Sequence, residues 1–321
     1  MKIKNTNNKS IFIYIKNDYF IRTVKSSKMS LNKPVWRLKS WVNPKDLNWN
    51  NLARNPRAIE LLKANPDKIN WYELSLNPNA IELLEANPDK IDWNYLSSNP
   101  NGIELLRANQ DKINWYQLSI NPNAIELLTA NQDKINWEQL SGNPNAIELL
   151  KANPNKINWY HLSANSNAIE LLRANQEKIR WVKLASNPNA IELLKANQDK
   201  IYWTLISKNP GAVEFISKNT EHIYWSQVSL NPNATELIKA NLDKIDWNYI
   251  QYNPALIDII RENNKMNWWY LSYNEGIFEL DYEAMRENNR ELYEELIKEV
   301  MKPSRVFKFP DYDYIEELFG E

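Results

Sequence analysis

Apolar and polar positions recur through the middle of the chain with a period of 22 residues. Tryptophan marks the period most clearly: it stands every 22 residues from Trp49 to Trp247 and returns at Trp268 after a one-residue deletion. A column of asparagines runs in the same register from Asn43 to Asn263. A repeat this short cannot bury a hydrophobic face alone, so the period predicts stacked repeats that share one continuous core.

Each repeat has the sequence signals of two short helices. In the unit that begins at Asn77, this residue suits a helix N-cap and Pro78 suits the first helical position. The apolar residues within 80–84 follow helical spacing, and Pro88 ends the segment. A second helix is expected to start after Asp92, another N-capping residue. We therefore predict an all-α fold, an α-solenoid of about ten two-helix repeats, extended into a rod or superhelix on the order of 100 Å long.

A leucine-rich-repeat horseshoe is the alternative fold. The period of 22 residues and the recurring spacing from Leu74 to Asn77 would suit it. That fold needs a strand with alternating apolar residues before the asparagine. The position two before the leucine holds residues as different as Tyr72, Asn94 and Glu138. This column favours helices over strands.

Charge divides the chain into three regions. Residues 1–34 carry eight Lys or Arg against one acid and are expected to be a disordered or loosely docked extension. Residues 35–274 form the predicted solenoid. Residues 275–321 carry fourteen acids against six bases, and we predict an acidic helical cap and tail there, with a long amphipathic helix over 275–301.

The chain lacks the residues that most catalytic, metal-binding and phosphate-binding sites need. There are no cysteines, five glycines and two histidines, His161 and His222, with no zinc-ligand spacing and no glycine-rich phosphate loop. We therefore predict no enzyme, no metal and no cofactor. The only strongly apolar run near the start, 11–15, is too short to span a membrane, so no membrane partner is expected. The solenoid is electrically neutral, which makes nucleic acid an improbable partner.

Several regular columns have structural interpretations. Every repeat has an acidic residue at one position, and a base usually lies three residues further on, as in Glu60 and Lys63, which predicts solvated or inter-repeat ion pairs. The lysine column that starts at Lys68 is expected to add counter-charge. The tryptophans are predicted to be core, and the asparagines at the positions of 65 and 77 to be helix caps and turn residues.

The residues that vary inside this constant frame are the predicted working surface. The second and fifth positions after each tryptophan lie three apart and are expected to share one outward helix face. A mixture of polar, aromatic and apolar residues on a stiff scaffold is typical of a protein-binding solenoid, and relaxed selection would leave the same mixture. The predicted partner-binding residues are Glu73, Tyr95, Gln117, Gln139, His161, Lys183, Gln227 and Tyr249.

The unit NPNAIELLEANPDKIDWNYLS resembles the Asn/Ile/Leu/Trp-rich repeat proteins of giant DNA viruses of amoebae and algae. The resemblance extends to KPVWRLKSWVNPKDLNW at 33–49 and to 277–309. It implies a repeat protein without catalytic residues, in the cytoplasm of an infected host cell or in the virion. It also favours Met29 as a natural start, with 1–28 as an upstream extension. Tyr202 and Tyr224 replace the usual capping residue, which puts the local geometry of two repeats in doubt.

Three functions remain open at this point. The leading prediction is a scaffold for protein–protein interaction that engages an unidentified host or viral protein. A structural component of a virion or assembly is the alternative. A modular reader of single-stranded nucleic acid is the third, and the neutral solenoid argues against it.

Overall fold

The computed structural model describes residues 34–290, together with 294 and 298. The chain divides into two compact units, one of Trp36–Glu279 and one of Met1–Val35 with Leu280–Glu321. The first unit holds the repeats. It also includes residues 275–279, which the sequence assigned to the C-terminal cap. The expected N-terminal extension, 1–34, lies outside the described residues except for Pro34.

The repeat unit is all-α, as predicted, and each repeat starts with a short helix whose first residue is usually the tryptophan. These first helices are α2 (Trp49–Leu52), α4 (Trp71–Leu74), α6 (Trp93–Ser98), α8 (Trp115–Ile120), α10 (Trp137–Gly142), α12 (Trp159–Ala164), α14 (Trp181–Leu184), α16 (Trp203–Ser207), α18 (Trp225–Val228), the 3-10 helix η10 (Tyr249–Tyr252) and α21 (Trp268–Leu271). The side chain of the preceding residue caps most of them, as Asp92 does by accepting a hydrogen bond from the backbone N–H of Tyr95.

A second short helix follows in each repeat, and most repeats add one turn of 3-10 helix. The second helices are α3 (Ile59–Lys63), α5 (Ile81–Glu85), α7 (Ile103–Ala108), α9 (Ile125–Thr129), α11 (Ile147–Ala152), α13 (Ile169–Arg173), α15 (Ile191–Lys195), α17 (Val213–Ser217), α19 (Thr235–Lys239) and α20 (Ile257–Glu262). The 3-10 turns after them are η1 (Pro66–Lys68), η2 (Pro88–Lys90), η3 (Gln110–Lys112), η4 (Gln132–Lys134), η5 (Pro154–Lys156), η6 (Gln176–Lys178), η7 (Gln198–Lys200) and η9 (Thr220–His222). The sequence did not predict this third element.

The predicted helix cap at Asn77 is wrong. The second helix of that repeat begins at Ile81, and its N-cap, Ala80, makes no side-chain capping bond. Asn77 to Ala80 form a turn instead, closed by a backbone hydrogen bond of 3.1 Å from Ala80 N to Asn77 O. The Asn77 side chain accepts from the backbone N–H of Asn79 at 3.0 Å, so it shapes this turn.

Leucine, rather than tryptophan, forms the centre of the core. Leu84 and Leu96, and their counterparts in the other described repeats, are completely inaccessible to solvent. The tryptophans, which were predicted to be core, are partly buried and pack against the edge of this core. The lysine of the following 3-10 turn covers the exposed ring: the Lys156 ammonium lies 4.4 Å from the centroid of Trp137.

Buried asparagines join most repeats to the one before. The Asn143 side-chain amide donates to the backbone carbonyls of Ser119 at 3.1 Å and Asn121 at 2.8 Å. The carbonyl of Ser119 lies at the end of α8, where helical carbonyls lack partners within the helix. The same pair of bonds recurs at Asn77, Asn99, Asn121, Asn165, Asn187, Asn209 and Asn231. This asparagine ladder therefore satisfies buried backbone groups between repeats.

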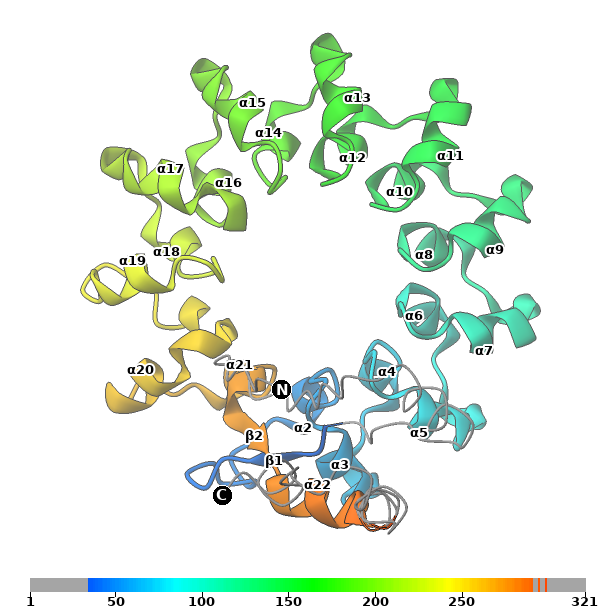
Figure 1. The fold of residues 1–321 in the computed structure, drawn as a ribbon, viewed down its shortest axis with the longest axis vertical. Helices are drawn as coiled ribbons and strands as arrows, with labels where there is room; N and C mark the ends of the chain where they lie inside the picture. The colour runs from blue at the N-terminus through cyan, green and yellow to red at the C-terminus, as the bar shows by residue number, and fades with distance from the viewer. Residues whose placement is uncertain (1–33, 291–293, 295–297, 299–321) are drawn as a thin grey trace, which may run out of the picture. The chain divides into compact units, whose positions relative to one another are not determined.

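The ladder also connects the first repeat to the last one. The Asn55 amide donates to the carbonyls of Ser272 at 3.2 Å and Asn274 at 3.1 Å, positions equivalent to those that Asn77 contacts. The repeats within Trp36–Glu279 therefore close into a ring (Figure 1). The first helices form its inner layer and the second helices its outer layer (Figure 1).

A small sheet completes this seam. Strand β1 (Trp36–Leu38) pairs with β2 (Phe278–Leu280), and the backbone N–H of Lys39 donates to the carbonyl of Ile277 at 2.9 Å. The expected extended rod or superhelix is therefore wrong, because the first and last repeats meet and close the array. The helix predicted over 275–301 starts later than expected: strand β2 comes first, helix α22 spans Tyr282–Asn288, and the described residues 290, 294 and 298 are also helical.

Candidate interaction surface

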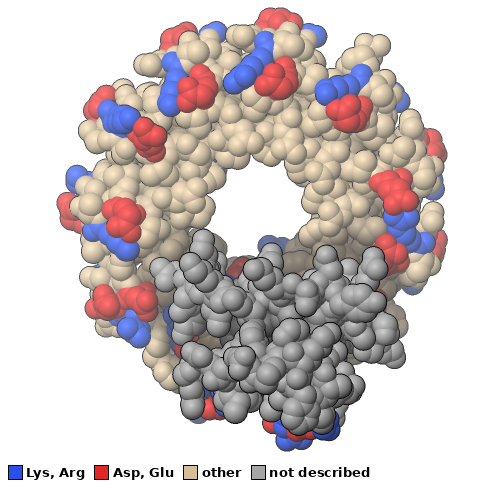
Figure 2. Space-filling view, viewed as in Figure 1, with Lys and Arg blue, Asp and Glu red and all other residues tan. Residues whose placement is uncertain are grey.

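The inner helices expose one side to the central opening of the repeat unit. In α8, Leu118 is buried in the core, whereas Tyr116 and Ile120 are 50% and 41% exposed. Successive residues of a helix are rotated by about 100°. The first and fifth positions after the tryptophan therefore point away from the core and toward the opening. Figure 2 shows that most of the inner rim visible in this view is uncharged and that Lys, Arg, Asp and Glu side chains gather on the outer rim.

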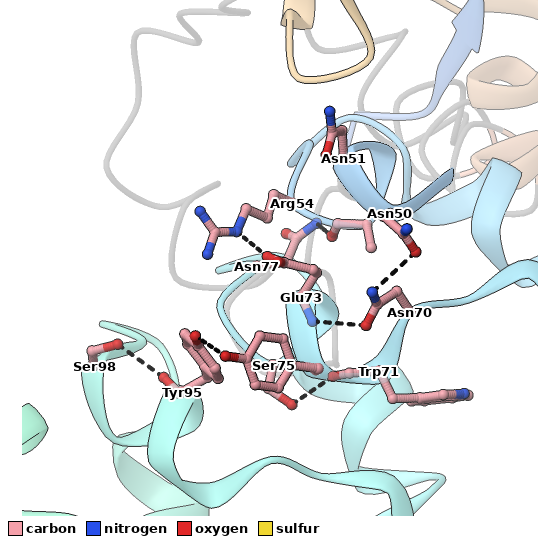
Figure 3. A network of polar contacts seen from close by, with 12 residues as sticks. Asn50, Asn51, Arg54, Asn70, Trp71, Glu73, Ser75, Asn77, Tyr95 and Ser98 are labelled. Atoms are coloured by element: carbon pink, nitrogen blue, oxygen red, sulfur yellow. Dashed lines mark hydrogen bonds and ion pairs between the residues drawn. The ribbon is translucent and has the colours of Figure 1, made fainter. Parts of the chain in front are cut away.

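The second position after the tryptophan faces the preceding repeat instead. Tyr95 contacts Tyr72 of the repeat before it: the rings pack edge to face with centroids 4.0 Å apart, and the two hydroxyls form a hydrogen bond (Figure 3). This hydrogen bond raises the pKa of Tyr72 to about 12. Glu73 likewise forms an ion pair with Arg54 of the preceding repeat (Figure 3).

Similar pairs continue around the inner layer. The Gln139 amide donates to the Tyr116 hydroxyl at 2.9 Å, and His161 Nε2 lies 3.1 Å from a carboxylate oxygen of Glu138. The Lys183 ammonium lies 4.6 Å from the ring centroid of Tyr160.

Five of the eight predicted binding residues thus have side chains engaged between repeats: Glu73, Tyr95, Gln139, His161 and Lys183. Part of the variation at this position is therefore explained by matching between neighbouring repeats. Tyr249 is 36% exposed, and Gln117 and Gln227 are half-buried, with no side-chain partner among the described residues. The structure does not bring the eight residues into one compact site, because each belongs to a different repeat around the ring.

The predicted surface left out the first position after the tryptophan. Tyr72, Tyr116 and Tyr160 are 48%, 50% and 44% exposed there, and Trp269 is 56% exposed. The sequence did contain a signal, because large aromatic residues recur at a position that is not part of the apolar core pattern. Without the ring, nothing indicated that this position turns toward a shared opening.

Ion pairs lie along the outer helices, as predicted. The pairs Glu60–Lys63, Glu148–Lys151 and Glu192–Lys195 have N–O distances of 2.7–2.9 Å. The lysine column has a different role from the one predicted, because Lys68 and its equivalents cover tryptophan rings. His222 takes the place of a lysine in this column and stacks on Trp203 with ring centroids 4.3 Å apart. This contact indicates a packing role for His222 and gives no support to a catalytic one.

The described residues contain no group of three or more His, Cys, Asp or Glu side chains arranged to hold a metal ion. Within the same residues, no helix is long and apolar enough to cross a membrane. The surface that the geometry offers is therefore the aromatic and polar lining of the inner helices. Comparison with known proteins finds no matching family model, curated protein or solved structure.

Proposed function

We propose that this chain is a non-enzymatic scaffold whose ring of repeats binds a partner protein on its inner face. The observation that carries the proposal is the set of exposed aromatic and aliphatic side chains on the inner helices, among them Tyr72, Tyr116, Ile120 and Tyr160. Aromatic residues are enriched in the centres of protein interfaces because they bury a large area with few rotatable bonds. Buried leucine, serine and asparagine side chains hold the backbone beneath them in a nearly constant frame.

The same lining gives less support to the alternative functions. A reader of nucleic acid needs clustered Lys and Arg for the phosphates, whereas Arg54 is paired with Glu73 and most of the visible inner rim is uncharged. A spacer that assembles end to end needs free terminal repeats, and here the ladder and the small sheet occupy both ends. The resemblance to repeat proteins of giant DNA viruses supports a host or viral protein as the partner.

The test is affinity capture of the tagged protein with in-cell cross-linking, read by mass spectrometry. A Tyr116→Ser/Tyr160→Ser variant removes two exposed inner rings, and a Glu148→Gln/Glu170→Gln variant changes two exposed outer carboxylates as the matched control. We expect recovery of a stoichiometric partner to fall at least about tenfold with the inner variant and to stay unchanged with the outer one. A partner recovered equally well with both variants, or no stoichiometric partner at all, contradicts the proposal.

A further inference from the structure

The asparagine ladder loses both of its bonds at one junction of the ring. This junction joins the repeat of α18 and α19 to the repeat of η10 and α20, and we call it the α19–η10 junction (Figure 1). Asn253 occupies the ladder position of the second of these repeats and is 4% exposed. Its side-chain oxygen accepts from the backbone N–H of Ala255 at 3.0 Å, as in the other repeats. Its amide nitrogen, however, is buried and has no hydrogen-bond partner among the described residues.

A further contact is missing at the α19–η10 junction. In most repeats an exposed asparagine two residues after the ladder position donates to the preceding repeat, as Asn233 does to a proline carbonyl at 3.0 Å. Ala255 occupies this position here and has no side-chain donor. The backbone N–H of Asp246 still donates to Ser229 Oγ at 3.0 Å. A regular junction has four such bonds, so the α19–η10 junction keeps one of the four.

The backbone of the same junction is also irregular. The inner element η10 is a 3-10 helix that begins after Trp247, whereas the other inner helices are α-helices that begin at the tryptophan. Residues 241–248 contain no helix, although most other repeats form a 3-10 turn at the equivalent of 242–244. Hydrogen bonds in a 3-10 helix have poorer geometry than those in an α-helix. The connection between α19 and η10 thus departs from the regular structure where the inter-repeat bonds are missing.

On its other side, the η10 repeat is bonded firmly to the last repeat. Gln251 replaces the serine that most repeats have at this position. Its side-chain amide donates to the carbonyl of Lys265 at 2.8 Å, and its side-chain oxygen accepts from the backbone N–H of Asn267 at 3.2 Å. The Asn274 amide donates to the Gln251 carbonyl at 2.5 Å. The ladder and the small sheet then join the last repeat to the first, so the seam keeps its bonds and the α19–η10 junction does not.

The missing bonds change the free energy of separating two repeats. At a regular junction, separation breaks the bonds of a buried asparagine amide to two carbonyls. At the α19–η10 junction it instead lets water reach the Asn253 amide and the Ser229 carbonyl, which have no partners among the described residues in the closed ring. A buried polar group without a partner has lost its hydrogen bonds to water without compensation. Local opening is therefore expected to cost least at this junction.

We propose that the α19–η10 junction is a hinge of the ring, at which the inner layer opens locally between α18 and η10. The repeats from η10 to the seam form one side of the hinge, and those up to α19 form the other. Segment 241–248 keeps the two sides connected and absorbs the change in backbone angles. This inference goes beyond partner binding, because it gives a closed ring a defined place at which its central opening can change.

The experiment is hydrogen–deuterium exchange of the full chain at neutral pH, read by mass spectrometry on overlapping peptides. The reporting segment is 229–234, which packs against η10 only if the junction is closed. Its matched control is 185–190, the equivalent segment after α14. After correction for intrinsic rates, we expect the amides of 229–234 to exchange at least about tenfold faster than those of 185–190.

The control matches the reporting segment in its local structure. Helices α14 and α18 have the same length, and neither has a side-chain N-cap. The backbone N–H of Ala185 and that of Ser229 each donate to the tryptophan carbonyl four residues earlier at 3.0 Å. The two segments differ in the next repeat: the Asn209 amide donates to the carbonyls of Ala185 and Asn187 at 2.8 and 2.9 Å, whereas the Asn253 amide has no partner.

Three variants test whether the ladder bonds cause the difference. Asn209→Ala removes both bonds of the control junction and should speed exchange of 185–190 at least about tenfold. Asn253→Ala removes an amide without a partner and should change exchange of 229–234 less than about threefold. Ala255→Asn supplies the donor that most repeats have and should slow exchange of 229–234 at least about threefold.

Three results would overturn the hinge: equal protection of 229–234 and 185–190, faster exchange of the seam segment 272–277 than of 229–234, or an effect of Asn253→Ala as large as that of Asn209→Ala. The first two comparisons use the unaltered chain and so do not depend on whether a variant folds. The experiment contains no partner, so its failure would leave the proposed scaffold function standing.

Discussion

Asn143→Ala should lower the free energy of unfolding by about 2–4 kcal/mol, although it changes one uncharged side chain and creates little cavity. The Asn143 amide is fully buried and donates to two carbonyls of the preceding repeat. Its oxygen accepts from the backbone N–H of Asn145 at 3.0 Å. Alanine leaves the buried carbonyl of Ser119 without a partner, which costs about 1–3 kcal/mol, and it also removes the bond that holds the partly buried N–H of Asn145.

Asn145→Ala is the matched control. This asparagine stands two residues away in the same turn, is exposed, and donates one bond of 2.9 Å to the carbonyl of Pro122. Its loss should cost less than about 1 kcal/mol, because water replaces the bond. Urea unfolding followed by circular dichroism measures both values. Equal effects of the two substitutions would show that the buried ladder does not hold the repeats together.

Leu140→Ala should destabilise the protein by about 2–5 kcal/mol, through lost burial and the cavity that remains. Leu140 lies in the middle of the inner helix α10 and is completely inaccessible to solvent. Ile120→Ala removes an aliphatic side chain of similar size that is 41% exposed, and this control should change stability by at most about 1 kcal/mol. The same urea titration compares the two. A larger effect at Ile120 than at Leu140 would reverse the assignment of inner-face and core positions.

The helical repeat was predictable because its signals are local. The period of the tryptophans, the capping residues such as Asp92 and the apolar spacing within 80–84 each depend on residues close in sequence. Packing outweighed local signals in two repeats: α16 and α18 begin at Trp203 and Trp225 even though Tyr202 and Tyr224 provide no side-chain cap. The doubt that the sequence raised about these repeats is therefore resolved in favour of the regular geometry.

The role of the buried asparagines was not predictable from one repeat. Asparagine after a short helix and before proline is equally typical of a cap, a turn or a ladder. Asn77 is distinguished only by the carbonyls of Ala53 and Asn55, which lie in the preceding repeat. The half-buried tryptophans have a similar cause, because the lysine that covers Trp137 comes from the 3-10 turn at the end of the repeat.

Ring closure depends on a small angle multiplied over the whole array, and sequence patterns do not contain such an angle. The one indication of closure in the sequence is the segment with Trp36 and Trp41, which is aromatic and does not follow the repeat. In the structure, Trp41 packs against Trp268 with ring centroids 6.2 Å apart, across the seam. The interaction surface was likewise only partly predictable from the sequence. The sequence indicated the variable helix, but only the stacking shows which of its positions turn toward the opening and which toward the preceding repeat.

The measurement that tests closure most directly is a distance across the seam in solution. Arg37 and Glu279 form an ion pair of 3.1 Å between β1 and β2, and both are exposed enough for labelling. Because the chain has no cysteine, the Arg37→Cys/Glu279→Cys variant carries nitroxide labels at these two positions only. Arg37→Cys/Glu148→Cys, with the second label on α11 away from the seam (Figure 1), is the control. The closed ring predicts strong dipolar broadening of the electron paramagnetic resonance spectrum for the seam pair and none for the control. Spectra without broadening for both pairs would mean that the repeats form an open array and would contradict the ring.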